Sequence, residues 1–389
     1  MRLSSPTTKR EPGDRARRTT SSPATAAPGA ACSPPPVSQS PTLIRTAHAS
    51  GLNAVAHELI ALHAETLRAG EEGSTPVRLS CLTLVAACTD EAGTETAEVV
   101  ASRIAETSPA RIIIILADPA AAEASITADL SLQCSVRGGG QVCAEQVQLR
   151  VAGEPARHLL SVVAPLLLPD VPVYLWVVGA PPLDQALSDD VAGACERVIL
   201  DSNGYADSAR TLMLLATHAS VQPRLRLADL AWVRGRRWRE LLAQAFDGPD
   251  MPRYLRGLQS LAVTTAGDRP CSDGWLIAGW IASRVPPTAG ESFSPKVEMA
   301  TISGSDAAPR LAAVELEGHA GGGAARVRLA REQGVITCSL EVERGPRLVR
   351  SLPATDPSTA ELVGSILQET DVDPIHLAAL RAAALADNA

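Results

Sequence analysis

The sequence Pro165-Leu-Leu-Leu-Pro-Asp-Val-Pro-Val-Tyr-Leu-Trp-Val-Val-Gly-Ala-Pro-Pro182 determines how this chain folds. Its residues 173–178 form a continuous apolar run rich in β-branched and aromatic side chains. Such a run is typical of a strand buried on both faces of a parallel sheet. The prolines on either side of it disfavour helix. We therefore predict a central strand at 173–178.

The segments around this strand predict a parallel α/β unit. Residues 154–168 indicate a helix, and Arg197-Val-Ile-Leu-Asp-Ser202 indicates a second short buried strand that ends in the turn Asn203-Gly204. The connection of residues 179–196 is long enough for the crossover that parallel strands need. Upstream, we predict helices at 51–69 and 95–107 and strands at 77–88 and 111–116. Runs near 128–136 and 142–151 flank the glycines at 138–140, which predicts a hairpin at a sheet edge.

The pattern changes after a second group of helices. Helices are expected at 205–218, in the second half of 227–247 and at 271–283, with a strand at 258–264. The Pro-rich segment 284–295 is the predicted linker. Beyond it, Ile336, Cys338, Leu340 and Val342 alternate with polar residues, as in a half-solvated antiparallel strand. With 297–303, 311–317, 324–331 and 347–353 this strand predicts a meander, and Asp356-Pro357 and Asp373-Pro374 predict the starts of two closing helices.

The predicted fold class is therefore α/β, with a largely parallel or mixed sheet covered by helices, followed by a smaller antiparallel β-meander with closing helices. We expect a disordered Pro/Ser/Arg-rich tail at 1–50, because that segment has almost no large apolar residues to bury. An α/β domain is expected at 51–290, with an N-terminal part at 51–168 and a central part at 169–290. The C-terminal meander and its two helices are expected at 296–389.

The composition limits the possible partners. The chain has 389 residues and a formal charge of −8. Residues 1–50 carry seven basic and two acidic side chains, so the remainder carries −13. This acidic body argues against a nucleic-acid partner. No apolar run approaches the roughly 18 residues that span a membrane. We expect a soluble, cytoplasmic protein.

Two groups of residues are candidates for function. Cys134 and Cys143 flank the glycine loop of the predicted hairpin and could approach each other across its strands. They are either small buried hydrophobic residues or a redox pair, for which we expect that oxidation forms a bridge. The segment 228–240 is either an amphipathic core helix after a capped turn or a partner-binding surface, because Trp and Arg are enriched at interfaces. The partner-binding candidates are Asp229, Trp232, Arg236, Arg237, Arg239 and Glu240.

Catalytic signatures are absent from the sequence. It has no GxSxG, GxGxxG, Walker, HExxH or paired Cys/His metal spacing, so we expect no catalytic residues, no metal and no cofactor. The alternative is an α/β enzyme or sensor that binds a sugar phosphate at the carboxyl ends of strands 173–178 and 197–201. Asp201, Ser202 and Asn203 would lie there. The other interpretation of Asp201-Ser-Asn-Gly204 is a simple turn.

The same segments resemble one family, the glucose-6-phosphate dehydrogenase assembly protein OpcA. The resemblance rests on residues 82–85, 108–115, 165–176, 197–202, 229–242 and 278–283, in matching order and spacing. The blocks 165–176 and 229–242 are the most specific, and the resemblance covers about 51–389, more weakly in the meander and the final helices. Ala144 stands where some members have a second cysteine, and Ser108-Pro109 replaces a more usual His-Pro.

The resemblance implies a non-catalytic partner of glucose-6-phosphate dehydrogenase. Members of the family promote the assembly and activation of that enzyme at the entry to the oxidative pentose phosphate pathway. In photosynthetic members, control by thiol redox state is associated with this role. The resemblance therefore implies that this chain binds the dehydrogenase, promotes its active oligomer and is redox-modulated.

Overall fold

The predicted central strand forms β6 (Val173–Val178) in the interior of an eight-stranded sheet. β6 lies between β2 (Thr83–Cys88) and β7 (Arg197–Leu200) and runs parallel to both. Val173 is partly buried and the other five residues of β6 are buried. This burial on both faces is what the uninterrupted apolar run requires.

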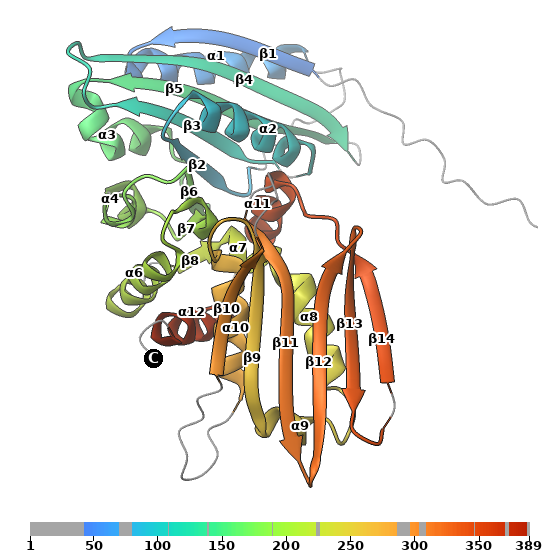
Figure 1. The fold of residues 1–389 in the computed structure, drawn as a ribbon. Coiled ribbons are helices and arrows are strands. Elements are labelled where there is room, and N and C mark those ends of the chain that lie inside the picture. The colour runs from blue at the N-terminus through green and yellow to red at the C-terminus, as the bar shows by residue number, and fades with distance from the viewer. Residues whose placement is uncertain are drawn as a thin grey trace, which may run out of the picture. The chain divides into compact units, whose positions relative to one another are not determined.

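The computed structural model (Figure 1) describes residues 43–69, 80–107, 109–137, 140–188, 190–222, 226–285, 296–302, 309–345, 347–369 and 373–386. By their contacts, these described residues belong to one compact unit.

The first sheet has the strand order β1-β4-β5-β3-β2-β6-β7-β8. Its remaining strands are β1 (Leu43–Ser50), β3 (Arg111–Asp118), β4 (Ser125–Arg137), β5 (Gly140–Ala152) and β8 (Arg226–Asp229). Neighbours from β5 to β8 are parallel, whereas β4 is antiparallel to β5 and to β1. The mixed, largely parallel sheet and the β4–β5 hairpin are confirmed.

Strand β1 corrects two expectations. Residues 43–50 lie in the segment predicted to be a disordered tail, but they form a strand that pairs with β4 along its whole length. The hairpin is therefore not the sheet edge, because β1 lies outside it. The strand was missed because it buries little apolar surface: Ile44 is exposed, and Ala47 and Ala49 are small. Its pairing rests on backbone hydrogen bonds, which the hydrophobic pattern does not reveal.

Helices cover both faces of this sheet. α1 (Leu52–Ala69), α3 (Leu159–Val163), α4 (Leu183–Ser188), α5 (Asp190–Ala194) and α6 (Ser208–Val221) share one core with Val85, Leu175 and Val177. α2 (Glu91–Thr107) packs on the other face against Leu84 and Trp176. The helix predicted at 154–168 is divided into η1 (Glu154–Arg157), α3 and η2 (Ala164–Leu166), and a proline is the second residue of both η1 and η2.

The second sheet has six strands in the order β10-β9-β11-β12-β13-β14. They are β9 (Leu258–Ala266), β10 (Lys296–Ile302), β11 (Arg310–Ala320), β12 (Gly323–Glu332), β13 (Val335–Val342) and β14 (Arg347–Pro353). The predicted meander is confirmed from β11 to β14. However, β9 lies between β10 and β11 and runs parallel to β10, so the first step of the meander was wrong.

Three helices cover one face of the second sheet, as Figure 1 shows: α8 (Arg236–Ala245), α9 (Pro252–Arg256) and α10 (Ser272–Arg284). They share a core with the inward residues of β13, which include Ile336, Cys338 and Leu340. The alternation of apolar and polar residues in that strand therefore identified its buried face.

The closing helices are α11 (Thr359–Gln368) and α12 (Pro374–Ala386). Asp373 caps α12 as predicted, because its Oδ1 accepts from the backbone N–H groups of Ile375 and His376. The predicted start of α11 at Asp356-Pro357 was wrong, since Ser358 and Glu361 form a capping box there. α11 joins the core of α2, and α12 joins the core of α6. Most of the predicted linker, at 286–295, lies outside the described residues, and the domain boundaries stay a prediction.

Candidate functional site

The segment predicted to bind a partner connects the two sheets. It runs from β8 through α7 (Leu230–Arg234) into α8. Asp229 ends β8 and caps α7, because its Oδ1 accepts from the backbone N–H of Ala231 at 3.0 Å. Trp232 then packs in the core of the first sheet, whereas Trp238 packs in the core of the second. The apolar face predicted for this helix is therefore a core face.

Trp232 is an internal anchor. It is 6% exposed, and its Nε1 donates to Asp373 Oδ2 at 2.7 Å. The Arg239 guanidinium carbon lies 3.4 Å from the centroid of the Trp232 ring, and Arg239 Nη1 donates to the Trp232 carbonyl at 2.6 Å. The His376 ring stacks on the indole with a centroid distance of 5.2 Å. These contacts hold α7 and α8 to α12.

Burial shifts the pKa values of the two titratable side chains, His376 and Arg239, that pack on the Trp232 ring. It lowers the pKa of His376 to about 4, so the imidazole is neutral near pH 7. It also lowers the pKa of Arg239, to about 10, which leaves the guanidinium charged. A charged guanidinium over an indole and a neutral ring stacked on it are both favourable arrangements.

The other candidates of this segment reach the surface. Arg236, Arg237 and Glu240 are exposed. Arg236 Nη2 lies 2.5 Å from Glu369 Oε1, and Arg237 Nη1 donates to the carbonyl oxygens of Pro353 and Thr355. A contact between these three side chains and a partner stays a prediction. Asp229 and Trp232 face the interior of the chain instead.

Four side chains near the ends of β7 and β8 make a largely buried ionic network, which we call the strand-end cluster: Asp201, Asp229, Arg234 and Asp273. Arg234 bridges two of its carboxylates, since Nη2 donates to Asp201 Oδ2 at 2.6 Å and Nη1 to Asp273 Oδ1 at 3.1 Å. Asn203 joins the network by donating to Asp273 Oδ2 at 2.9 Å. Asp273 is in the first turn of α10, so the network connects the ends of β7 and β8 to α10.

A pocket of about 360 Å³ lies beside the cluster, at the carboxyl ends of β2 and β6. The chain turns from β2 to β3 on one side and from β6 to β7 on the other, so this is the switch point where open α/β sheets bind ligands. Asp90 and Asp201 line the pocket together with Trp176, and none of its thirteen lining residues is basic. Asp90 Oδ1 already accepts from Gly93 N at the start of α2. The pocket therefore offers no counter-charge to a phosphate.

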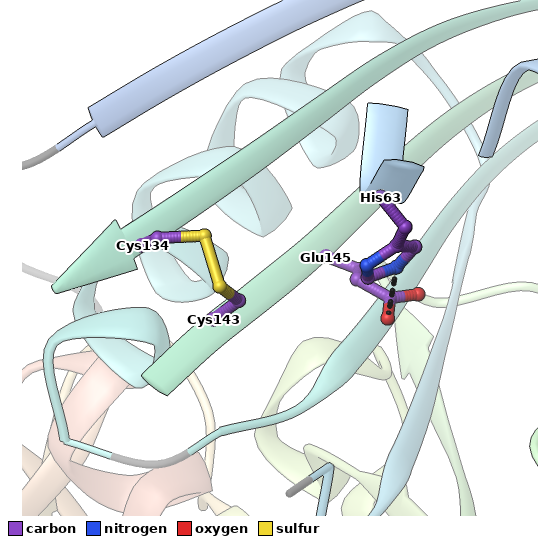
Figure 2. Close-up of a disulfide and its surroundings, with 4 residues drawn as sticks. All are labelled: His63, Cys134, Cys143 and Glu145. Atoms are coloured by element: carbon purple, nitrogen blue, oxygen red, sulfur yellow. Dashed lines mark ion pairs between the residues drawn. A yellow bond between two sulfur atoms is a disulfide. The ribbon is translucent and has the colours of Figure 1, made fainter. Parts of the chain in front are cut away.

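The predicted cysteine pair lies at the turn end of the β4–β5 hairpin (Figure 2). Cys134 and Cys143 are register partners and form a disulfide. Cys134 is buried and Cys143 is partly buried. Figure 2 shows His63 of α1 beside Glu145, with an Nε2–Oε1 distance of 2.7 Å. The structure brings the two sulfur atoms together, and their role in regulation stays a prediction.

Sequence reasoning missed most members of these networks. Arg234, Asp273 and His376 come from segments far apart in the chain, and each stands in a helix with no local signal of a polar role. Asp373 was identified only as a cap. Within the described ranges, no group of three or more His, Cys, Asp and Glu side chains could hold a metal ion. None of the helices in those ranges is long and apolar enough to cross a membrane.

Comparison with known proteins gives two family matches and several relatives. Residues 101–217 match the family described as the N-terminal domain of a "Glucose-6-phosphate dehydrogenase subunit", and residues 225–380 match the family described as the C-terminal domain of that subunit. An "OxPP cycle protein OpcA" of Synechococcus elongatus is 30% identical over 190 residues, which are 48% of this chain and 42% of that protein. The protein of the same name from Synechocystis sp. is 28% identical over 202 residues, 51% of this chain and 42% of its own length.

A third protein of that name, from Nostoc punctiforme, is 28% identical over 189 residues, 48% of this chain and 40% of its own length. The matched part thus spans about two fifths of the length of these curated relatives. The two family matches extend from α2 through α12 and include the segments on which the sequence resemblance rests most firmly. Because they cover more than half of the chain, the chain belongs to the glucose-6-phosphate dehydrogenase assembly protein OpcA family.

Proposed function

We propose that this chain is a non-catalytic factor that binds glucose-6-phosphate dehydrogenase and promotes its active oligomer, at the entry to the oxidative pentose phosphate pathway. The observation that carries the proposal is the pair of family matches, both described as domains of a glucose-6-phosphate dehydrogenase subunit. A factor of this kind activates its client by binding one conformation or oligomer more tightly than the others. It acts in the cytoplasm, where the enzymes of the pathway are found.

The hydrogen bonds among polar residues at the strand ends support a non-catalytic role. Asp201 and Asn203, at the edge where an α/β enzyme would bind its ligand, are engaged with Arg234 and Asp273. The adjoining pocket has acidic lining residues and no basic ones, which disfavours the sugar-phosphate alternative. Glucose 6-phosphate and 6-phosphogluconate should therefore leave the melting temperature of the chain unchanged.

Redox modulation forms the finer part of the proposal. Cytosolic disulfides in mesophilic organisms are usually transient and redox-sensing, and Cys134–Cys143 is the disulfide of the described residues. Burial raises the pKa of the Cys88 and Cys338 thiols to about 11 and that of Cys271 to about 12, which makes these three poorly reactive. Reduction of the bridge at the hairpin would thus be the step that changes the affinity for the dehydrogenase.

The test is reconstitution with the dehydrogenase of the same genome. Native mass and specific activity are measured with and without this chain, after oxidation and after reduction. We expect a larger complex and a higher activity, with a difference between the two redox states that the Cys143→Ser variant abolishes. Unchanged mass and unchanged activity in both states would reject the assembly role. Activation that ignores the redox state would reject only the finer part.

The contact surface is tested separately. An Arg236→Ala, Arg237→Ala double variant should weaken binding of the dehydrogenase, because both side chains are exposed on α8. Arg347→Ala is the matched control, since this arginine is 68% exposed on β14 of the second sheet. Equal affinities of the double variant and the control would place the contact elsewhere.

A further inference from the structure

The strand-end cluster has an excess of negative charge in a buried place. Asp229 is 2% exposed and Asp273 is 5% exposed, and Asp201 is half-buried. The cation among them is Arg234, so three ionised carboxylates would leave the cluster at −2. Uncompensated charge is costly at such burial, and a buried carboxyl without a counter-ion takes up a proton instead.

The hydrogen bonds identify which carboxyl lacks compensation. Arg234 donates to Asp201 and to Asp273. Asp229 Oδ1 accepts from two backbone N–H groups, those of Ser202 at 3.1 Å and Ala231 at 3.0 Å. Its Oδ2 is buried and has no hydrogen-bond partner, and the same is true of the nearby Ser202 Oγ. Asp229 Oδ2 is thus an unpartnered oxygen within a cluster that already carries too much negative charge.

The other titratable and charged groups around Asp229 do not neutralise it. Burial raises the pKa of the Tyr205 hydroxyl and of the Cys271 thiol, both to about 12, so neither is charged near pH 7. Arg269, on the loop before α10, donates to the Tyr205 carbonyl and lies beside the exposed Asp268. It therefore contributes no ion pair to the carboxylates of the cluster.

We propose that the strand-end cluster binds a proton on Asp229 at neutral pH, and that this proton holds the ends of β7 and β8 together. With the proton bound, Asp229 Oδ2 can donate to Ser202 Oγ, and the cluster carries −1. When the proton leaves, Asp229 and Asp201 repel each other at neighbouring strand ends. The contact between the ends of β7 and β8 is then weakened in alkaline solution.

The shifts in pKa agree with this assignment. Burial, followed by the charge of Asp201, raises the pKa of Asp229 from 3.8 to about 7. Burial raises the pKa of Asp273 to about 6 despite the opposing effect of Arg234. Because the folded state holds the Asp229 proton more tightly than the unfolded state, stability is lost as the pH rises from 3.8, the ordinary pKa of the group, to about 7, its pKa in the folded chain. From pH 6 to pH 8, the titration of Asp229 alone raises the unfolding equilibrium constant about tenfold.

The experiment compares unfolding of the full chain by urea at pH 6 and pH 8. In the Asp229→Asn variant the amide keeps the acceptor for both backbone N–H groups and donates toward Ser202, so it imitates the protonated acid. We expect the unfolding constant of this variant to rise about tenfold less between the two pH values than that of the parent chain. Asp250→Asn is the matched control, because Asp250 is 80% exposed, and it should behave as the parent chain does.

Equal pH dependence of Asp229→Asn and the parent chain would overturn the proposal. Should the variant fail to fold, infrared spectroscopy of the parent chain decides the matter. A carbonyl band of a protonated carboxylic acid should persist at pH 7, above the pKa of about 6 of Asp273, and should largely disappear by pH 8. Absence of that band at pH 7 would refute a bound proton on Asp229.

Discussion

Replacing Trp232 by phenylalanine separates the two interpretations of the tryptophan and arginine segment. The substitution removes the donor to Asp373 Oδ2, which lies 2.7 Å from Nε1. A hydrogen bond to a charged group contributes about 1.5–3 kcal/mol. It also weakens the contact with the Arg239 guanidinium, 3.4 Å from the ring centroid, which is worth about 0.5–2 kcal/mol. We expect the free energy of unfolding to fall by about 2–4 kcal/mol.

A double-mutant cycle in urea unfolding measures the contact with Asp373. Asp373→Asn keeps an oxygen that can cap α12 but removes the charge that Trp232 Nε1 meets. The two substitutions should couple by about 1 kcal/mol or more, because they act on one hydrogen bond. Trp275→Phe is the control, since Trp275 is only partly buried and should lose less than about 1.5 kcal/mol. Additive effects, or a loss of less than about 1 kcal/mol for Trp232→Phe, would refute the internal anchor.

An assay of dehydrogenase activation tests the other interpretation, in which Trp232 contacts the partner. An internal anchor changes activation only by unfolding the chain, so the folded Trp232→Phe variant should activate normally. Undiminished stability together with lost activation would instead identify Trp232 as a residue that contacts the partner.

Three further substitutions test other joints of the fold. Arg234→Met leaves two carboxylates of the strand-end cluster unpaired, and should lower the free energy of unfolding in urea by about 3–5 kcal/mol at pH 7.5. The loss should be smaller at pH 5, because buried carboxyls become protonated there. An equal loss at both pH values would contradict the pairing. Cys143→Ser should cost about 2–3 kcal/mol under oxidising conditions by loop entropy, and nothing relative to the reduced parent chain. Gly279→Ala would place a Cβ against the Ala379 carbonyl oxygen, closer than the two atoms can approach, and should lower the free energy of unfolding by about 1–3 kcal/mol. The control Gly364→Ala adds a Cβ that meets no atom within 4 Å, and should not destabilise the chain. Limited proteolysis at α12 would reveal the difference between the two variants.

The sequence predicted best the strands whose continuous apolar composition indicates burial on both faces. β6 was predicted with its observed bounds, because prolines enclose an apolar run that both faces of the sheet bury. β3 and β7 carry comparable runs and were found within a few residues of their ends. The β4–β5 hairpin was found from its glycine turn, and this placed Cys134 opposite Cys143.

What the sequence did not predict depends on pairing between distant segments. β9 reads as an ordinary buried strand, and nothing in it indicates that it inserts between β10 and β11. β1 is held by backbone pairing to β4, with an exposed Ile44 and no core of its own. The strand-end cluster combines the residue that follows β7 with residues from β8, α7 and α10, each of which is ordinary in its local sequence. Only the folded chain brings such charges within hydrogen-bonding distance.

The depth of each residue in the segment from β8 to α8 determines which of them a partner can reach. The Arg236–Glu369 pair is exposed at both ends, and an exposed ion pair contributes only about 0–1 kcal/mol. A carboxylate of a partner protein can therefore replace Glu369 at little cost. Trp232 and Asp229 have no such freedom, because turning either outward would break buried hydrogen bonds and leave Asp373, Ser202 or Arg239 without its partner. The exposed arginines of α8 are thus open to exchange, whereas the buried Asp229 and Trp232, which precede α8 on β8 and α7, keep the first sheet joined to α7 and α12.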